Sequence, residues 1–220
     1  SLFSSATFSL GAISRFLCFC ASSATFFLMP FFLVSGLRMT TAEAALYLLP
    51  AAVSMSVFGP ISCKIGDRIG TRIPSTLGMI LAIVSMYLYS IITLESNPMI
   101  VAVASAISGT GMSIFMAPNA SVMLGAAGRE RYGIVSAFLN LTRNGAHVVG
   151  IAVPTAVVVL VMGTMGYDAD LSDTEKLKDI GLRFAYVSAM TKAFQISIGL
   201  MIVATILVVI SPTDRSLRSQ

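Results

Sequence analysis

Apolar residues gather in long runs along the chain, and most charged residues fall between those runs. A helix needs about 20 predominantly apolar residues to cross the hydrocarbon core of a bilayer. Six runs reach that length, and they predict membrane-spanning helices at residues Leu10–Val34, Ala44–Cys63, Pro74–Leu94, Pro98–Ala126, Ile134–Met162 and Ala189–Ile210. Glycines and prolines inside the runs do not exclude helices, because neighbouring membrane helices satisfy the freed backbone groups. The pattern therefore predicts an all-α integral membrane protein with a six-transmembrane-helix bundle.

Composition favours the same class and argues against others. Hydrophobic residues make up 56% of the chain and charged residues 11%, and the mean hydropathy is +0.88, whereas soluble domains carry about a quarter charged residues. The three cysteines lie in or at the end of apolar runs, so they predict small buried hydrophobic residues and neither a metal site nor a disulfide framework. We expect no cofactor, and no nucleic-acid partner, because basic residues that flank spans set orientation.

The connections between the runs differ in charge from one side to the other. Residues 64–72, residues 128–132 and the tail 211–220 are rich in Lys and Arg, whereas the alternate connections are more acidic. Basic connections remain in the cytoplasm during membrane insertion. We therefore expect a multi-pass protein of the cell membrane with both ends of this segment in the cytoplasm.

The segment Lys64–Arg72 is predicted to be a charged loop between the second and third spans. Its pattern Gly-Asp-Arg-x-Gly-x-Arg is formed by Gly66, Asp67, Arg68, Gly70 and Arg72. Glycines permit tight turns, a carboxylate complements a helix N-terminus, and arginines bind helix C-terminal carbonyls or anionic lipid. One interpretation is a latch that clamps neighbouring helix ends on the cytoplasmic face. The alternative is a loop that is basic only because it is cytoplasmic.

The fifth predicted span carries a polar stripe formed by Asn140, Arg143, Asn144 and His147. These positions are spaced i, i+3, i+4 and i+7, so they share one helical face. His147 lies about 20 Å along the helix from Ile134, near the bilayer midplane. A charge at that depth costs at least about 2.5–3.5 kcal/mol and faces a partner or a wet cavity. Either the stripe borders a translocation path or a seam with another part of the protein, or its members make structural hydrogen bonds.

Other residues are candidates for the path, the seam or helix packing. Arg15 and Asn119 are polar residues inside apolar runs, and Arg15 also lies near enough to the cytoplasmic end to anchor at the interface. Small residues allow close helix approach, and prolines bend helices. The predicted packing or hinge positions are Gly109, Gly111, Pro118, Gly145, Gly150 and Pro154.

Five motifs in order resemble the major facilitator superfamily, in its drug:proton antiporter branch with fourteen spans. They are the Gly66–Arg72 pattern, Met29-Pro30-Phe31-Phe32-Leu33, Leu48-Leu49-Pro50, Gly109-Thr110-Gly111 with Pro118-Asn119, and Arg143-Asn144-Gly145 followed by Gly150. The resemblance implies the C-terminal six-helix half of a multidrug efflux transporter, built as a 3+3 inverted repeat, with the N-terminal half missing from this chain. It implies proton-coupled efflux of drugs or amphipathic small molecules by alternating access.

The implied partners are a small-molecule substrate, protons, the lipid bilayer and the missing N-terminal half. An importer of the same superfamily and a non-transporting membrane sensor or scaffold remain alternatives. An enzyme is not expected, because the predicted spans hold no Asp or Glu and the chain has a single His.

Overall fold

Six long α-helices form the protein in a computed structural model that describes residues 6–127, 129–167 and 179–211, and the backbone alone at 6, 67–69, 126–127 and 129. The helices are α1 (Ala6–Phe31), α2 (Thr41–Ile69), α3 (Arg72–Ser90), α4 (Met99–Ala127), α5 (Tyr132–Thr164) and α6 (Ile180–Ile210). A short π-helix, η2 (Phe32–Gly36), prolongs α1, and a 3-10 turn, η3 (Arg129–Arg131), precedes α5. All six α-helices are long and apolar enough to cross a membrane, and the described residues contain no β-strand. The predicted six-helix membrane bundle is confirmed.

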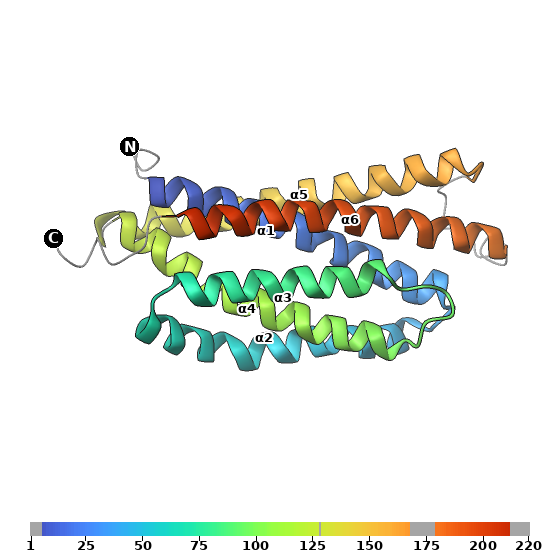
Figure 1. The fold of residues 1–220 in the computed structure, drawn as a ribbon, viewed down its shortest axis with the longest axis horizontal. Helices are drawn as coiled ribbons and strands as arrows, with labels where there is room; N and C mark the ends of the chain where they lie inside the picture. The colour runs from blue at the N-terminus through green and yellow to red at the C-terminus, as the bar shows by residue number, and fades with distance from the viewer. Residues whose placement is uncertain (1–5, 128, 168–178, 212–220) are drawn as a thin grey trace.

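The helices pack as two groups of three (Figure 1). Helix α4 packs most extensively on α2 and α3, whereas α1 packs on α5 and α6. Contacts between α3 and α6 and between α1 and α4 join the groups. The start of α1 and the end of α6 lie at the same end of the bundle (Figure 1), as an even number of crossings requires.

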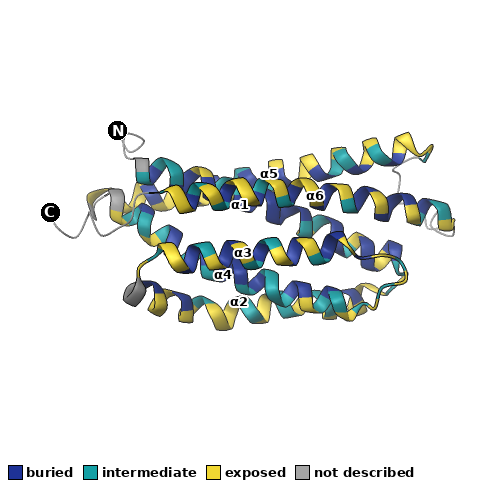
Figure 2. Ribbon diagram, in the orientation of Figure 1, coloured by how far each residue is buried: buried dark blue, intermediate teal, exposed yellow. Residues whose placement is uncertain are grey.

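The core follows α1, and the outer faces of the bundle remain apolar. Ala21, Ala24 and Leu28 of α1 are completely buried. In contrast, Leu46 of α2 and Leu160 of α5 are more than 60% exposed, and Figure 2 shows exposed stripes along the outside of both groups. Exposed apolar stripes of this extent are unfavourable in water and suit contact with lipid or with further protein.

Hydrogen bonds between helices satisfy several polar groups in the interior. The Tyr89 hydroxyl of α3 and the Ser105 hydroxyl of α4 lie 3.0 Å apart, and both side chains are buried. The Tyr186 hydroxyl of α6 donates to the Leu28 carbonyl of α1 across 3.0 Å. These bonds fix the rotation of each helix against its neighbour, because an unpaired buried hydroxyl is unfavourable.

The prediction that residues 64–72 form a loop is wrong for most of that segment. Helix α2 continues to Ile69, and Arg72 already begins α3, so only Gly70 and Thr71 connect the two helices. Gly70 has a φ of 88° and its amide donates to the Gly66 carbonyl across 3.0 Å. The charged residues do not end the helix; the glycine does, because its left-handed conformation is unfavourable for other residues.

Two other predicted boundaries are also wrong. The sixth span begins at Ile180 and not at Ala189, with Asp179 as its N-cap, whose carboxylate accepts from the Gly181 amide across 2.8 Å. Hydropathy underestimates the length of this helix, because its first turns, from Ile180 onward, precede the apolar run that predicted the span. The third helix ends at Ser90, not at Leu94, and the Thr93 amide donates to the Ser96 hydroxyl in the turn that follows.

Glycines bring three pairs of helix backbones into close contact. A Cβ added at Gly111 of α4 would lie 2.6 Å from the Gly78 carbonyl oxygen of α3. A Cβ at Gly109 would strike the Ala51 carbonyl of α2, and one at Gly150 of α5 would lie 2.7 Å from Cys20 Cα of α1. Small residues are required at these three crossings. A Cβ at Gly145, in contrast, would have no described neighbour within 4 Å.

Candidate functional site

A cavity of about 280 Å³ lies where α1, α2, α4 and α5 meet. Each helix contributes residues separated by one or two turns, so each presents one face to the cavity. The lining residues are Phe19, Ser22, Phe26, Ala51, Met55, Ser108, Gly109, Met112, Met116, Arg143, Asn144 and His147. The cavity therefore combines a largely apolar wall from three helices with a polar wall from α5.

Helix α5 brings three members of the predicted polar stripe to this cavity. Arg143, Asn144 and His147 all line it, as expected for residues one turn apart on one face. Asn140 does not line it; its side-chain amide donates to the Ser136 carbonyl of the same helix across 3.2 Å. Arg143 and Asn144 are exposed although they line the cavity. This side of the cavity is consequently open.

His147 is both a cavity residue and a structural hydrogen-bonding partner of α1. Its Nδ1 lies 2.6 Å from the Ser23 hydroxyl oxygen, and the Ser23 hydroxyl donates to the Phe19 carbonyl across 2.7 Å. A hydroxyl has a single hydrogen, so when Ser23 directs that hydrogen to Phe19, His147 is the donor to Ser23 through Nδ1. In the neutral ring Nε2 is then an acceptor, which gives His147 a second polar atom for other contacts.

Aromatic rings and sulfur atoms form the wall around His147. The His147 ring centroid lies 5.5 Å from that of Phe19 and 6.1 Å from that of Phe26, both in edge-to-face geometry. Met112 Sδ lies 3.8 Å from Ser22 Oγ and 3.8 Å from Cys18 Sγ. A wall of flexible methionine and aromatic side chains suits apolar ligands of varied shape.

Arg15 lies behind this wall and is not exposed at an interface. Its side chain is only 6% exposed, and its guanidinium carbon lies 5.0 Å from the centroid of the Phe19 ring. The Nε and Nη1 atoms have no hydrogen-bond partner within the described part of the chain. The interface-anchoring interpretation therefore does not fit, because a residue at the interface would reach water.

Asn119 lies away from the cavity, at the crossing of α1 and α4. Its side-chain nitrogen donates to the Gly11 carbonyl across 3.3 Å, and the residue is 5% exposed. Pro118 beside it lies within a continuous α4. Its Cγ is 3.6 Å from the position that a Cβ on Gly66 would take. Both residues therefore contribute to contacts between neighbouring helices.

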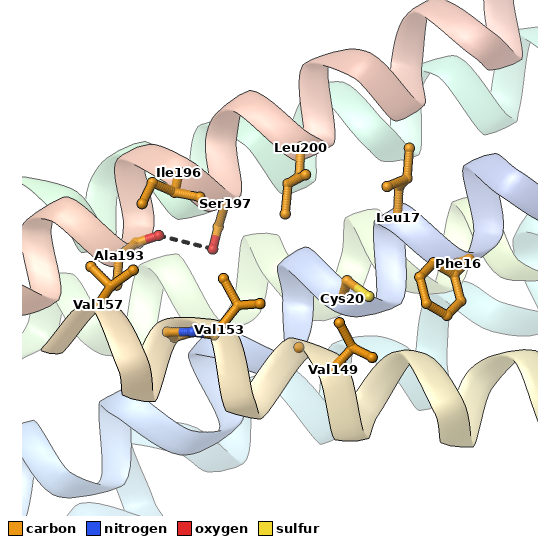
Figure 3. Close-up of a pocket in the computed structure, with 12 residues that line it drawn as sticks. Phe16, Leu17, Cys20, Val149, Val153, Val157, Ala193, Ile196, Ser197 and Leu200 are labelled. Carbon is orange, nitrogen blue, oxygen red and sulfur yellow. Dashed lines mark hydrogen bonds between the residues drawn. The ribbon is translucent and has the colours of Figure 1, made fainter. Parts of the chain in front are cut away.

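A second pocket, of about 240 Å³, lies among α1, α5 and α6. Figure 3 shows Val149 and Val153 of α5 facing Leu17 of α1 and Leu200 of α6. Gly150 and Pro154 also line this pocket. Its one hydroxyl, that of Ser197, already donates to the Ala193 carbonyl across 3.0 Å. The pocket holds no charged side chain and can accept only an apolar group.

At the predicted cytoplasmic end, the Gly66–Arg72 segment touches two other helices. The Arg72 guanidinium donates to the Val209 carbonyl in the last turn of α6. Gly66 faces Pro118 of α4. The side chains of Asp67 and Arg68 lie outside the described residues. Arg72 thus links the start of α3 to the C-terminal end of α6, one of the contacts expected of a helix-end clamp.

Sequence reasoning missed the residues with which α5 interacts. Ser23, the partner of His147, and Ser108 of α4 are ordinary serines in apolar runs, and nothing in the sequence says which helices meet there. The N-cap of α2 had a readable signal. Thr40 and Glu43 form a capping box, with the Glu43 amide donating to Thr40 Oγ1 across 3.3 Å, and their spacing of three residues is the motif.

The family model described as "Major Facilitator Superfamily" matches residues 1–151 of the chain. The chain is 25% identical over 190 residues to the Lincomycin resistance protein LmrB of Bacillus subtilis, covering 84% of this chain and 40% of the relative. It is 29% identical over 111 residues to the Uncharacterized MFS-type transporter YhcA of the same organism, covering 50% and 21%.

A third relative covers nearly the whole chain. The Riboflavin transporter RibZ of Clostridioides difficile is 23% identical over 218 residues, which is 98% of this chain and 45% of the relative. The chain therefore spans less than half the length of each of these three curated relatives.

Proposed function

The chain belongs to the Major Facilitator Superfamily, and we propose that it is the C-terminal six-helix half of a proton-coupled exporter of drugs or other amphipathic small molecules. The observation that carries this proposal is the cavity at α1, α2, α4 and α5, where an apolar wall faces Arg143, Asn144 and His147. Transporters of this architecture place their solute site between two halves near the bilayer midplane. The open, polar side of this cavity fits a site that a second half completes.

Alternating access then consists of rocking this bundle against the other half around the cavity. The close crossings at Gly109, Gly111 and Gly150 would let the bundle move as a unit, because tightly packed helices transmit motion without deforming. The segment Gly66–Arg72 would act as a latch on the cytoplasmic face, with Arg72 holding the end of α6. Export of drugs is supported by the likeness to the Lincomycin resistance protein LmrB.

Proton coupling is part of the proposal, and His147 is the residue of this half whose side chain titrates near neutral pH in water. The predicted spans contain no Asp or Glu. A carboxylate that carries the proton would therefore belong to the other half, and His147 would respond to it across the cavity. The basic connections favour an orientation in which the start of α1 and the end of α6 face the cytoplasm.

The test is transport by the full-length protein in inside-out membrane vesicles. Lincomycin should accumulate when a proton gradient is imposed, and a protonophore should abolish the accumulation. If lincomycin and a panel of unrelated drugs accumulate equally with and without the gradient, proton-coupled export is refuted.

A second candidate is transport of a solute that is not a drug. It is favoured by the match to the Riboflavin transporter RibZ along 98% of this chain. The same vesicles, loaded or bathed with riboflavin in place of lincomycin, separate the two: movement of riboflavin alone, and its direction, would assign a solute transporter in place of a drug exporter.

A further inference from the structure

Three basic side chains gather where α1 and α5 meet, and we name Arg15, Arg143 and His147 the cation cluster. Arg143 and His147 line the cavity, and Arg15 stacks on the Phe19 ring whose side chain also lines it. The Phe19 ring also packs edge-to-face on His147, which lies one helical turn from Arg143 on α5. One wall of the cavity therefore concentrates positive charge.

Arg15 is the least compensated member of the cluster. Its guanidinium is buried, and two of its nitrogens have no hydrogen-bond partner among the described residues. The Phe19 ring face attracts the cation but does not accept its in-plane N–H groups. Burial also leaves this charge without the water that would stabilise it. An anion placed in the cavity would offset this charge, and the guanidinium fork of Arg143, which lines the cavity, matches the two oxygens of a carboxylate.

No acidic side chain that the structure describes can supply that anion. The described acids are Glu43 at the start of α2, Glu95 after α3, Glu130 in η3 and Asp179 at the N-cap of α6. All of them lie at helix ends or in connections, and the cavity lining contains no Asp or Glu. Within the described part of the chain, therefore, no side chain neutralises this wall, and a bound anion could do so.

The apolar residues that line the rest of the cavity indicate which kind of anion would fit. Phe26, Met55 and Met116 form an apolar wall opposite α5. A small inorganic anion would leave that wall unused, whereas an aromatic body would pack against it. Arg143 and Asn144 are exposed, so the charged end of a ligand can reach them from the open side.

Building on the transport role proposed above, we propose that the cation cluster binds the carboxylate of an aromatic amphipathic solute. Arg143 contacts the carboxylate directly. Arg15 acts as a positioning residue through its stacking on Phe19 and its positive charge. The ring of the solute packs against Phe26 and the methionines of α2 and α4.

The test compares 2-naphthoate with 2-naphthamide, which has the same shape and no charge, by calorimetric titration of the full-length protein. We expect the wild type to bind naphthoate more tightly. Arg143→Gln should weaken naphthoate binding by about tenfold to hundredfold, the loss typical of a hydrogen bond to a charged group, with naphthamide binding nearly unchanged. Unchanged naphthamide binding also shows that the variant is folded. Arg15→Gln should reduce the same preference.

Lys192→Gln is the matched control, since Lys192 is an exposed cation of α6 that lines neither pocket, and it should keep the wild-type preference. Equal wild-type affinity for naphthoate and naphthamide overturns the proposal. So does a preference that survives both arginine substitutions, the result expected if an acid of the other half pairs with the cluster. If the wild-type protein prefers naphthoate but transports no solute in the vesicle assay, the transport role is refuted and the proposed carboxylate site is not.

Discussion

Replacing Gly150 with alanine should push α5 away from α1. The added Cβ would lie 2.7 Å from Cys20 Cα and 2.8 Å from Ser23 Cβ. Carbon atoms settle at about 3.5–4.0 Å, so the helices must separate by about 1 Å at this crossing. The His147–Ser23 bond, now 2.6 Å, would lengthen to about 3.6 Å and be lost. Overpacking of this kind destabilises by about 1–3 kcal/mol.

Two readouts on the full-length protein measure this effect. Thermal unfolding in detergent reports the loss of stability. Maleimide labelling of Cys20, located by mass spectrometry, reports the separation of the helices, because Cys20 is only 6% exposed in the wild type and lines the pocket beside Gly150.

The matched control is Gly145→Ala, five positions earlier on α5, where a Cβ would meet no atom of the described residues within 4 Å. It should leave both readouts unchanged or raise stability slightly, since alanine favours helix by up to about 1 kcal/mol over glycine. A Gly150→Ala protein as stable as the wild type, with Cys20 still unlabelled, would refute the close crossing of α1 and α5. Equal destabilisation by both substitutions would assign the effect to α5 alone.

Two further predictions test single contacts, and a third tests the proposed latch. Thr40→Ala should destabilise by about 1 kcal/mol, because the capping box with Glu43 is lost, and Thr40→Ser should restore stability in thermal unfolding. Tyr89→Phe should lower stability by about 1–3 kcal/mol by leaving buried Ser105 unpaired, and adding Ser105→Ala should recover most of it; equal melting of the single and double variants would count against the bond. Asp67→Asn should slow vesicle transport and leave solute affinity nearly intact, whereas a large loss of affinity would contradict the latch.

The six helices could be predicted from the sequence because hydropathy measures how much of a segment tolerates lipid. Hydropathy alone could not give their ends, because it does not measure helicity, although the Thr40 and Glu43 capping box marks the start of α2. Residues 64–69 include three charged residues yet are helical, and the first turns of α6 contain Arg183, whose guanidinium donates to the Gly36 carbonyl at the end of η2. Gly70, with its positive φ, marks the true end of α2.

The residues of the candidate site also divide into those that the sequence predicts and those that it does not. Spacing on one helix placed Arg143, Asn144 and His147 on a common face, and all three line the cavity. The partners on α1, among them Ser23 and Phe19, depend on which helices pack together. Which helices pack together is decided by contacts such as the close approach of α1 and α5 at Gly150. A single sequence does not reveal these contacts.

The most direct test of the central claim asks whether the transported solute occupies the cavity. Met55→Cys places a thiol in the cavity wall on α2, and native Cys63, exposed on the same helix and outside the cavity, serves as an internal control. In the full-length protein, whichever of lincomycin or riboflavin is transported should slow maleimide labelling at position 55 and leave Cys63 labelling unchanged. Equal labelling of position 55 with and without a saturating solute, while transport continues, would contradict the assignment of this cavity as the solute site.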